Sequence, residues 1–147
     1  MMKDLRIRAA MPSDAPAVGD VLERCGLPVD GVPRLLEHFH VAILGTQIIG
    51  CAAGERCGET VVIRSVAVLP EHRDQGVATH VVRAALMRAR ANGARRAVLL
   101  ASSCPSYFAR YGFTLVPASK LPPEVMSSSE FHRAADTPPL CMWCELG

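Results

Sequence analysis

The sequence predicts an α+β domain in which a mostly antiparallel sheet is flanked by helices. Three apolar segments between residues 41 and 68 are separated by two short turns, Gly45-Thr46 and Cys57-Gly58-Glu59, a pattern typical of consecutive β-hairpins. The segment 60–101 then runs from a strand through a long helical pattern to a second apolar strand. Such a connection predicts a parallel strand pair with a right-handed crossover. We expect one domain over residues 1–147, because this length suits a single hydrophobic core.

The first half of the chain combines one strand, two helices and the hairpins. Leu5 and Ile7 alternate with arginines, which is the period-2 pattern of a strand with one buried face. Ser13 and Asp14 begin a helix whose apolar positions recur at helical spacing until Gly26. We expect a second short helix at 34–39 and then strands at 41–44, 48–53 and 60–68.

The second half begins with a long amphipathic helix. Its apolar positions start at Val77 and end before Gly93, a suitable C-terminal glycine. The continuous apolar run at 97–101 predicts a strand covered on both faces. We further expect a short helix at 105–111, strands at 113–116 and 140–146, and a surface excursion over Leu121–Pro139.

Composition excludes several classes of protein. Sixteen basic and 14 acidic residues leave a formal net charge of +2, and we expect these charges to be interspersed, which argues against a nucleic-acid partner. No stretch approaches the ~20 apolar residues of a membrane-spanning helix. The start of the sequence lacks an apolar signal core, so we expect a cytoplasmic location and reduced cysteines.

The segment Arg73-Asp74-Gln75-Gly76-Val77-Ala78 carries the clearest chemical signal. It lies between a strand and the long helix, at the carboxyl end of the strand, where open sheets bind ligands. Small residues at Gly76 and Ala78 let the backbone approach an anion, and the free amides of a helix start suit a pyrophosphate. The alternative is an ordinary glycine-containing helix start. Neither a Walker loop nor a dinucleotide fingerprint is present.

The segment Ser65–Ala78 resembles the cofactor motif of the GNAT acetyltransferase superfamily, Gln/Arg-x-x-Gly-x-Gly/Ala. Tyr107–Phe113 resembles the aromatic helix of the same superfamily, which ends in Gly-Phe, and the similarity covers about residues 5 to 116. Within the superfamily, the chain is most similar to small arsenic-resistance N-acetyltransferases, which are related to the acetyltransferase domain of N-acetylglutamate synthases. That likeness is carried by Cys25-Gly26-Leu27-Pro28, Leu36–Phe39, Arg64–Val68 and Cys141-Met142.

The resemblance implies a GNAT fold with the sheet splayed at its central parallel pair, and acyl transfer from acetyl-CoA to an amine without a metal. The backbones of Val66 and Val68 would pair with the pantetheine arm, and the Val66 N–H would polarise the thioester carbonyl. Arg73–Ala78 would hold the pyrophosphate. The residues expected at the cofactor are Val66, Ala67, Val68, Arg73, Asp74, Gln75, Gly76, Val77, Ala78, Ser103 and Phe108. For Ser103, capping of the next helix is the alternative.

Two residues depart from the pattern of this superfamily. Asp74 stands where a glycine is common, and we expect its carboxylate to cap the following helix. Phe108 stands where many GNAT enzymes carry a tyrosine that protonates the CoA thiolate. Tyr107 is the candidate acid, although it lies about 100° around the helix from position 108.

Candidates for the acceptor side are fewer. Glu55 is the candidate general base, with His38 and His40 as further candidates, and a solvated or packed position is the alternative for each. Arg64 interrupts an apolar strand, so its charge needs a partner or a cleft. It would hold an acceptor carboxylate or oxyanion, or else form a structural ion pair. Phe39 and Ser65 complete the expected acceptor site.

We expect the six cysteines to pack mainly in the core and not to bind metal or react. In Cys141-x-x-Cys144 the two thiols point to opposite faces of a strand, which spoils a chelate. We therefore expect no metal site, and binding of arsenic by these thiols is a minor alternative.

The predicted function is acetyl transfer from acetyl-CoA to the amino group of a small, anionic, amino-acid-like acceptor, with an amine-bearing arsenic compound as one candidate. A catalytically silent acyl-CoA-binding regulatory module and a protein or peptide N-acetyltransferase are the alternatives. We expect no nucleic acid or membrane partner, and a homodimer is left open.

Overall fold

The computed structural model describes residues 4–101, 108–126 and 140–146. The strands are β1 (Leu5–Ala9), β2 (Phe39–Leu44), β3 (Gln47–Cys57), β4 (Thr60–Val68), β5 (Arg96–Ala101), β6 (Thr114–Leu115) and β7 (Leu140–Glu145). The α-helices are α1 (Ala15–Arg24), α2 (Val32–Leu35), α3 (Val77–Ala91) and α5 (Pro123–Met126). The strands form one seven-stranded sheet in the order β1-β2-β3-β4-β5-β7-β6. Only β4 and β5 pair in parallel, so the predicted fold class is confirmed.

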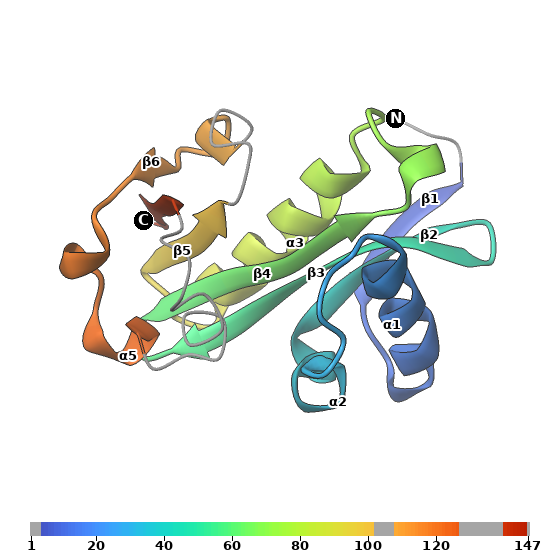
Figure 1. The fold of residues 1–147 in the computed structure, drawn as a ribbon, viewed down its shortest axis with the longest axis horizontal. Coiled ribbons are helices and arrows are strands. Elements are labelled where there is room, and N and C mark those ends of the chain that lie inside the picture. Colours follow the sequence, from blue (N-terminus) through green and yellow to red (C-terminus); the bar gives the residue numbers. More distant parts are fainter. Residues whose placement is uncertain (1–3, 102–107, 127–139, 147) are drawn as a thin grey trace.

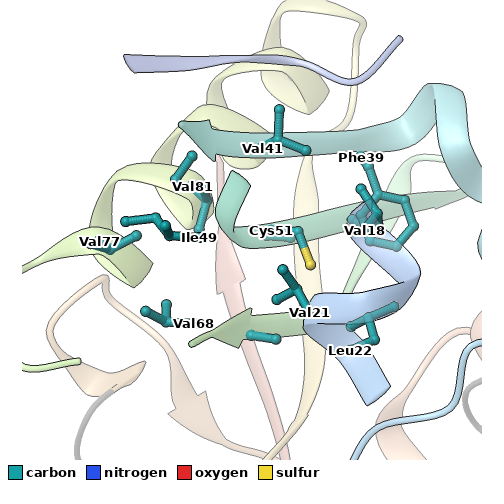
Figure 2. Packing of buried hydrophobic residues seen from close by; sticks show 14 of the residues in the cluster. Val18, Val21, Leu22, Phe39, Val41, Ile49, Cys51, Val68, Val77 and Val81 are labelled. Atoms are coloured by element: carbon teal, nitrogen blue, oxygen red, sulfur yellow. The ribbon is translucent and has the colours of Figure 1, made fainter. Parts of the chain in front are cut away.

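Helices cover both faces of this sheet, as Figure 1 shows, with α1 and α2 on one face and α3 on the other. The apolar stripe of α1 packs on the first face, where Val18 and Leu22 lie close to Phe39 (Figure 2). On the other face, Val77 and Val81 of α3 pack against Ile49 (Figure 2). None of the helices in the described part of the chain is long and apolar enough to cross a membrane.

Strand β4 changes its surroundings halfway along its length. Its parallel ladder with β5 runs from Thr60–Arg96 to Ile63–Leu99 and then stops, although β4 continues to Val68. Directly after this point Ser65 adopts a left-handed backbone with φ +56°, and the register with β3 shifts between Cys51 and Ala53. This bulge bends β4 away from β5. The expected splay of the parallel pair is therefore present.

Several predicted boundaries are wrong. The second helix is not at 34–39: α2 is a single turn at Val32–Leu35 with Pro33 near its start, where proline suits a helix. A 3-10 turn follows, and Phe39 already belongs to β2, because it pairs with Ala53. Strand β3 reaches Cys57, four residues past the predicted end, and β6 has only two residues.

The region after β6 is not simply a surface excursion. Leu121 and Val125 are buried against Val62 and Val98, so this part of the chain covers one face of the sheet beside β4 and β5. The prediction for Cys141 and Cys144 is confirmed, since their side chains belong to two different core clusters. The segment 127–139 lies outside the described residues.

Candidate active site

A cavity of about 680 Å³ lies at the carboxyl end of β4. It is bounded by the start of α3, the loop after α1 and Phe108, and its volume is typical of small-molecule sites. Most of the predicted cofactor residues line it: Val66, Ala67, Val68, Arg73, Asp74, Gly76, Val77, Ala78 and Phe108. Sequence reasoning missed five further lining residues, namely Cys25, Leu27, His72, Thr79 and Arg110. Gln75, although exposed in the same turn, is not part of the lining.

The floor of this cavity is a helix start with free amides. The first hydrogen bond of α3 is donated by the His80 amide to the Gly76 carbonyl. The three preceding amides, 77–79, therefore have no acceptor within the helix. No acidic residue lies in the first turn to offset their partial positive charge. The arrangement suits an anion, as the sequence predicted.

The turn before α3 holds two left-handed residues, Asp74 with φ +64° and Gly76 with φ +82°. The left-handed conformation explains why glycine suits position 74 and why aspartate is tolerated there. Gly76 is the residue that caps α3, and the exposed Asp74 side chain makes no hydrogen bond to the amides of the helix in the described part of the chain. The expectation that Asp74 caps the helix is therefore wrong.

Arg73 lies along the wall of the cavity. Its Nε atom donates to the Val68 carbonyl at 2.9 Å, and its Nη2 atom lies 3.5 Å from the Cys25 sulfur. The Cys25 thiol also donates to the Val68 carbonyl, at 3.4 Å. This carbonyl was expected to pair with the pantetheine arm, but in this structure it already accepts two donors. A ligand amide would have to displace one of them.

The aromatic residues near the cavity have different surroundings. Phe108 lines the cavity and packs edge-on against Phe113, with ring centroids 6.3 Å apart. Tyr111 donates its hydroxyl proton to the Thr79 Oγ1 atom at 2.7 Å, which links this aromatic segment to the first turn of α3. Tyr107 and Ser103, the candidate acid and a candidate cofactor contact, lie outside the described residues.

Glu55 and Arg64 meet in one ion cluster beneath α2. The Arg64 Nη1 atom lies 2.9 Å from Glu55 Oε1, and the Arg34 Nη1 atom lies 3.2 Å from Glu55 Oε2. The Arg64 side chain is 5% exposed and that of Glu55 is 14% exposed. Both oxygens of the candidate base are therefore engaged, and Arg64 has the ion-pair partner that the alternative interpretation required.

The remaining acceptor-side candidates are dispersed. Phe39 is 1% exposed and packs in the core on α1. Ser65 forms the bulge of β4, and its carbonyl accepts the Cys51 thiol at 3.5 Å. His38 and His40 line a different cavity, against α3, so the structure does not place them as bases at the cofactor cavity. Within the described ranges, no three metal-ligating side chains lie together.

Comparisons with known proteins agree on one family. The model of the acetyltransferase (GNAT) family matches residues 14–113. The N-acetylglutamate synthase of Neisseria gonorrhoeae, solved with coenzyme A and N-acetyl-glutamate, superposes with a TM-score of 0.85 and 19% identity over 100% of this chain. This chain spans only 36% of that protein's length. A search of the curated proteins gives no match.

Two further solved structures resemble this chain. The Rv2747 protein of Mycobacterium tuberculosis, in complex with CoA and a second ligand, has a TM-score of 0.80 and 23% identity, covering 95% of this chain and 98% of its own. A GNAT family acetyltransferase of Brucella melitensis, in complex with acetyl-CoA, has a TM-score of 0.64 and 26% identity, covering 75% and 82%. The TM-scores of these three structures show that they share the fold of this chain over the parts covered.

Proposed function

Because this chain belongs to the GNAT acetyltransferase family and is thus an acyltransferase, we propose that it acetylates the amino group of a small, anionic, amino-acid-like acceptor with acetyl-CoA as donor. The observation that carries the proposal is the 680 Å³ cavity, in which the free amides of α3, Arg73 and the end of β4 that has left its ladder with β5 meet.

The donor half of the site follows from this geometry. The amides of 77–79 and the Arg73 guanidinium would hold the pyrophosphate of acetyl-CoA, since charge-assisted hydrogen bonds from such groups are strong. The pantetheine arm would lie along Val66–Val68, where β4 no longer pairs with β5. The Val66 N–H would polarise the thioester carbonyl and stabilise the oxyanion that forms there.

The acceptor half rests on the cluster of Arg34, Glu55 and Arg64. Its two guanidinium groups favour an acceptor with a carboxylate or a similar anionic group. Glu55 is the proposed base, and the two arginines on its oxygens hold its orientation. With both oxygens engaged, Glu55 would take the proton of the acceptor ammonium through a water molecule rather than directly.

The leaving thiolate has no proton donor at position 108, because Phe108 replaces the tyrosine expected from the family pattern. Tyr107 stays the proposed acid. A missing general acid costs about 10²–10⁴-fold in rate and does not abolish transfer from a thioester, whose thiolate is a good leaving group.

The finer identity of the acceptor is drawn from the resemblance to arsenic-resistance N-acetyltransferases. An arsenic-bearing amino acid with an anionic group would present the same amine and charge as a glutamate-like acceptor, so both belong to the proposed class. A catalytically silent acyl-CoA-binding module is the second candidate. It is favoured by Phe108 and by the engagement of both Glu55 oxygens.

The proposal is tested by thiol release from acetyl-CoA against a panel of amines: glutamate, its phosphinate and arsenical analogues, a neutral amino acid and a basic peptide. Faster release with the anionic amino acids than with the neutral one supports the proposal. Binding of acetyl-CoA without release for any amine would establish the silent module instead. Release with the peptide alone would overturn the small-molecule acceptor.

A further inference from the structure

A second cavity, of about 230 Å³, lies on the face of the sheet that α3 covers. It shares no lining residue with the cofactor cavity. Its polar lining consists of His38, His40, Arg56, Arg88 and Asn92, and the rest is small or apolar. His38 ends the 3-10 turn before β2, His40 lies in β2, Arg56 lies in β3, and Arg88 lies in the last turns of α3.

Two buried nitrogen atoms at this cavity have no hydrogen-bond partner. His40 is 8% exposed, and its Nδ1 atom is fully buried without a partner among the described residues. The same is true of the Arg88 Nη1 atom. Burying such groups without a partner is costly, most of all for a charged guanidinium, so native proteins pair them with protein groups, water or a ligand.

The charge around these atoms is not balanced. None of the described lining residues is acidic, and neither Arg56 nor Arg88 has a carboxylate partner in the described part of the chain. Arg56 donates to the Asn92 carbonyl at 2.9 Å, and His38 lies 3.6 Å from the exposed Glu37 carboxylate, outside the lining. Burial and the nearby Arg88 charge lower the pKa of His40. The cavity therefore lacks a negative charge.

The sequence reinforces this imbalance. The expectation of interspersed charges is wrong for residues 75–123, which contain no Asp or Glu. The basic residues of that stretch are Arg83, Arg88, Arg90, Arg95, Arg96, Arg110 and Lys120. A neighbouring cavity on the same face, of about 520 Å³, is again lined by the basic side chains Arg8, His40, His80 and Arg83, of which Arg8 is paired with the Asp14 carboxylate.

We propose that the 230 Å³ cavity binds a compact oxyanion, a phosphate or a short carboxylate, through Arg88 and His40, with Arg56 at its rim. A guanidinium matches the planar or tetrahedral oxygens of such anions with paired N–H groups. The Nδ1 atom of His40, when it carries a proton, donates a further hydrogen bond. The volume accommodates inorganic phosphate or a dicarboxylate of a few carbons and excludes a nucleotide.

The test is a calorimetric and NMR titration with inorganic phosphate and, separately, with succinate, at constant ionic strength set by chloride. It is run on the free protein and on protein saturated with CoA, because the amides of α3 also attract anions. We expect saturable binding at one site that persists with CoA and shifts the His40 ring resonances, which are identified by their loss in His40→Gln.

The matched variants are Arg88→Gln and Arg90→Gln, which remove the same charge from the same helix, inside and outside the cavity. Arg88→Gln should weaken binding at least tenfold, and Arg90→Gln by less than twofold. His40→Gln should weaken binding independently of Arg88, provided that circular dichroism shows a folded protein. Tighter binding of phosphate than of succinate would identify the ligand as a phosphate, and the reverse order would identify it as a short carboxylate.

Three results would overturn the proposal: no saturable binding of either anion, equal weakening by the two arginine variants, or binding that disappears with CoA. None of these three binding results depends on acetyl transfer. The thiol-release assay tests the proposed function separately, so the two proposals can fail independently.

Discussion

Arginines on the two faces of the sheet have different partners among the described residues. On the face covered by α1 and α2, Arg64 is paired with Glu55 at 2.9 Å, and the same carboxylate holds Arg34. On the face covered by α3, Arg88 has a buried Nη1 atom without a partner, beside a histidine with a buried unpartnered nitrogen. The first guanidinium has a carboxylate partner among the described residues, whereas the second has none there and would be completed by the proposed anion.

The largest expected effect is the loss of Glu55. Glu55→Ala removes the carboxylate that pairs with the buried Arg64 side chain, and breaking a buried pair in this way typically costs about 3–5 kcal/mol of the free energy of unfolding. Urea denaturation measures it, with the exposed Glu59→Ala as the control, for which we expect less than about 0.5 kcal/mol. If the double variant Glu55→Leu/Arg64→Leu were as unstable as Glu55→Ala, the explanation by an uncompensated charge would be wrong.

The next effect separates structural from acceptor-binding roles of Arg64. Arg64→Leu should raise the KM for the acceptor about tenfold or more, since a charged hydrogen bond is worth about 1.5–3 kcal/mol, while the KM for acetyl-CoA is unchanged. Steady-state kinetics with each substrate varied in turn measures both constants. Unchanged acceptor kinetics would reject the role, and Arg34→Leu, on the exposed side of the same carboxylate, is the matched comparison.

Asp14 provides a third, smaller effect, at the edge of the α3 face. Its carboxylate accepts the Met11 amide at 2.7 Å and pairs with Arg8 at 2.6 Å, and the hydrogen bond from Arg8 lowers the pKa of Asp14. The resulting stabilisation is therefore complete above the ordinary carboxyl pKa of about 4, and it is lost as the pH falls through the lower folded value.

We expect Asp14→Asn to lower the free energy of unfolding by about 1–2 kcal/mol at pH 7, with a difference from the wild type that shrinks below pH 4. Denaturation curves measured across this range supply the values. A difference that stayed constant between pH 7 and pH 2 would show that the charge of Asp14 does not contribute. Asp20→Asn, at an exposed position of α1, is the control.

The smallest expected effect is at Asp74, a carboxylate beside an anion site. Asp74→Gly relieves a left-handed conformation in a non-glycine residue and should raise the free energy of unfolding by about 0.5–1 kcal/mol. It also removes a negative charge from the lining of the cofactor cavity, so CoA should bind about twofold to tenfold more tightly. Calorimetric titration with CoA provides the measurement. Weaker binding would mean that Asp74 organises the turn.

Parts of this charge distribution were visible in the sequence. The turn at Gly58-Glu59 sets Cys57 opposite Thr60 and Glu55 opposite Val62, so that Arg64, two residues farther along, shares a face with Glu55. The register of this hairpin alone brings Glu55 and Arg64 to one face, although the predicted role of each residue did not include the other. The absence of Asp and Glu from residues 75–123 can likewise be read directly from the sequence.

Other contacts depend on how distant elements pack. Cys25 meets Arg73 only because the loop after α1 folds over the end of β4, and His40 meets Arg88 only because α3 crosses β2. Local periodicity fixes which face of an element is apolar, but it does not fix which polar residues of two elements lie opposite each other. The cofactor turn was predictable because Arg73–Ala78 is contiguous, and the acceptor side was less so because its residues come from different elements.

The bulge at Ser65 has a consequence for solubility as well as for the site. Among the described residues, the edge of β4 that faces β5 has no ladder partner beyond Ile63, and an open strand edge in most proteins is a template for aggregation with another chain. A bulge twists the strand locally, so a flat strand from a second molecule cannot follow this edge. The same distortion that opens the sheet for an extended small-molecule arm therefore protects the protein from edge-to-edge association.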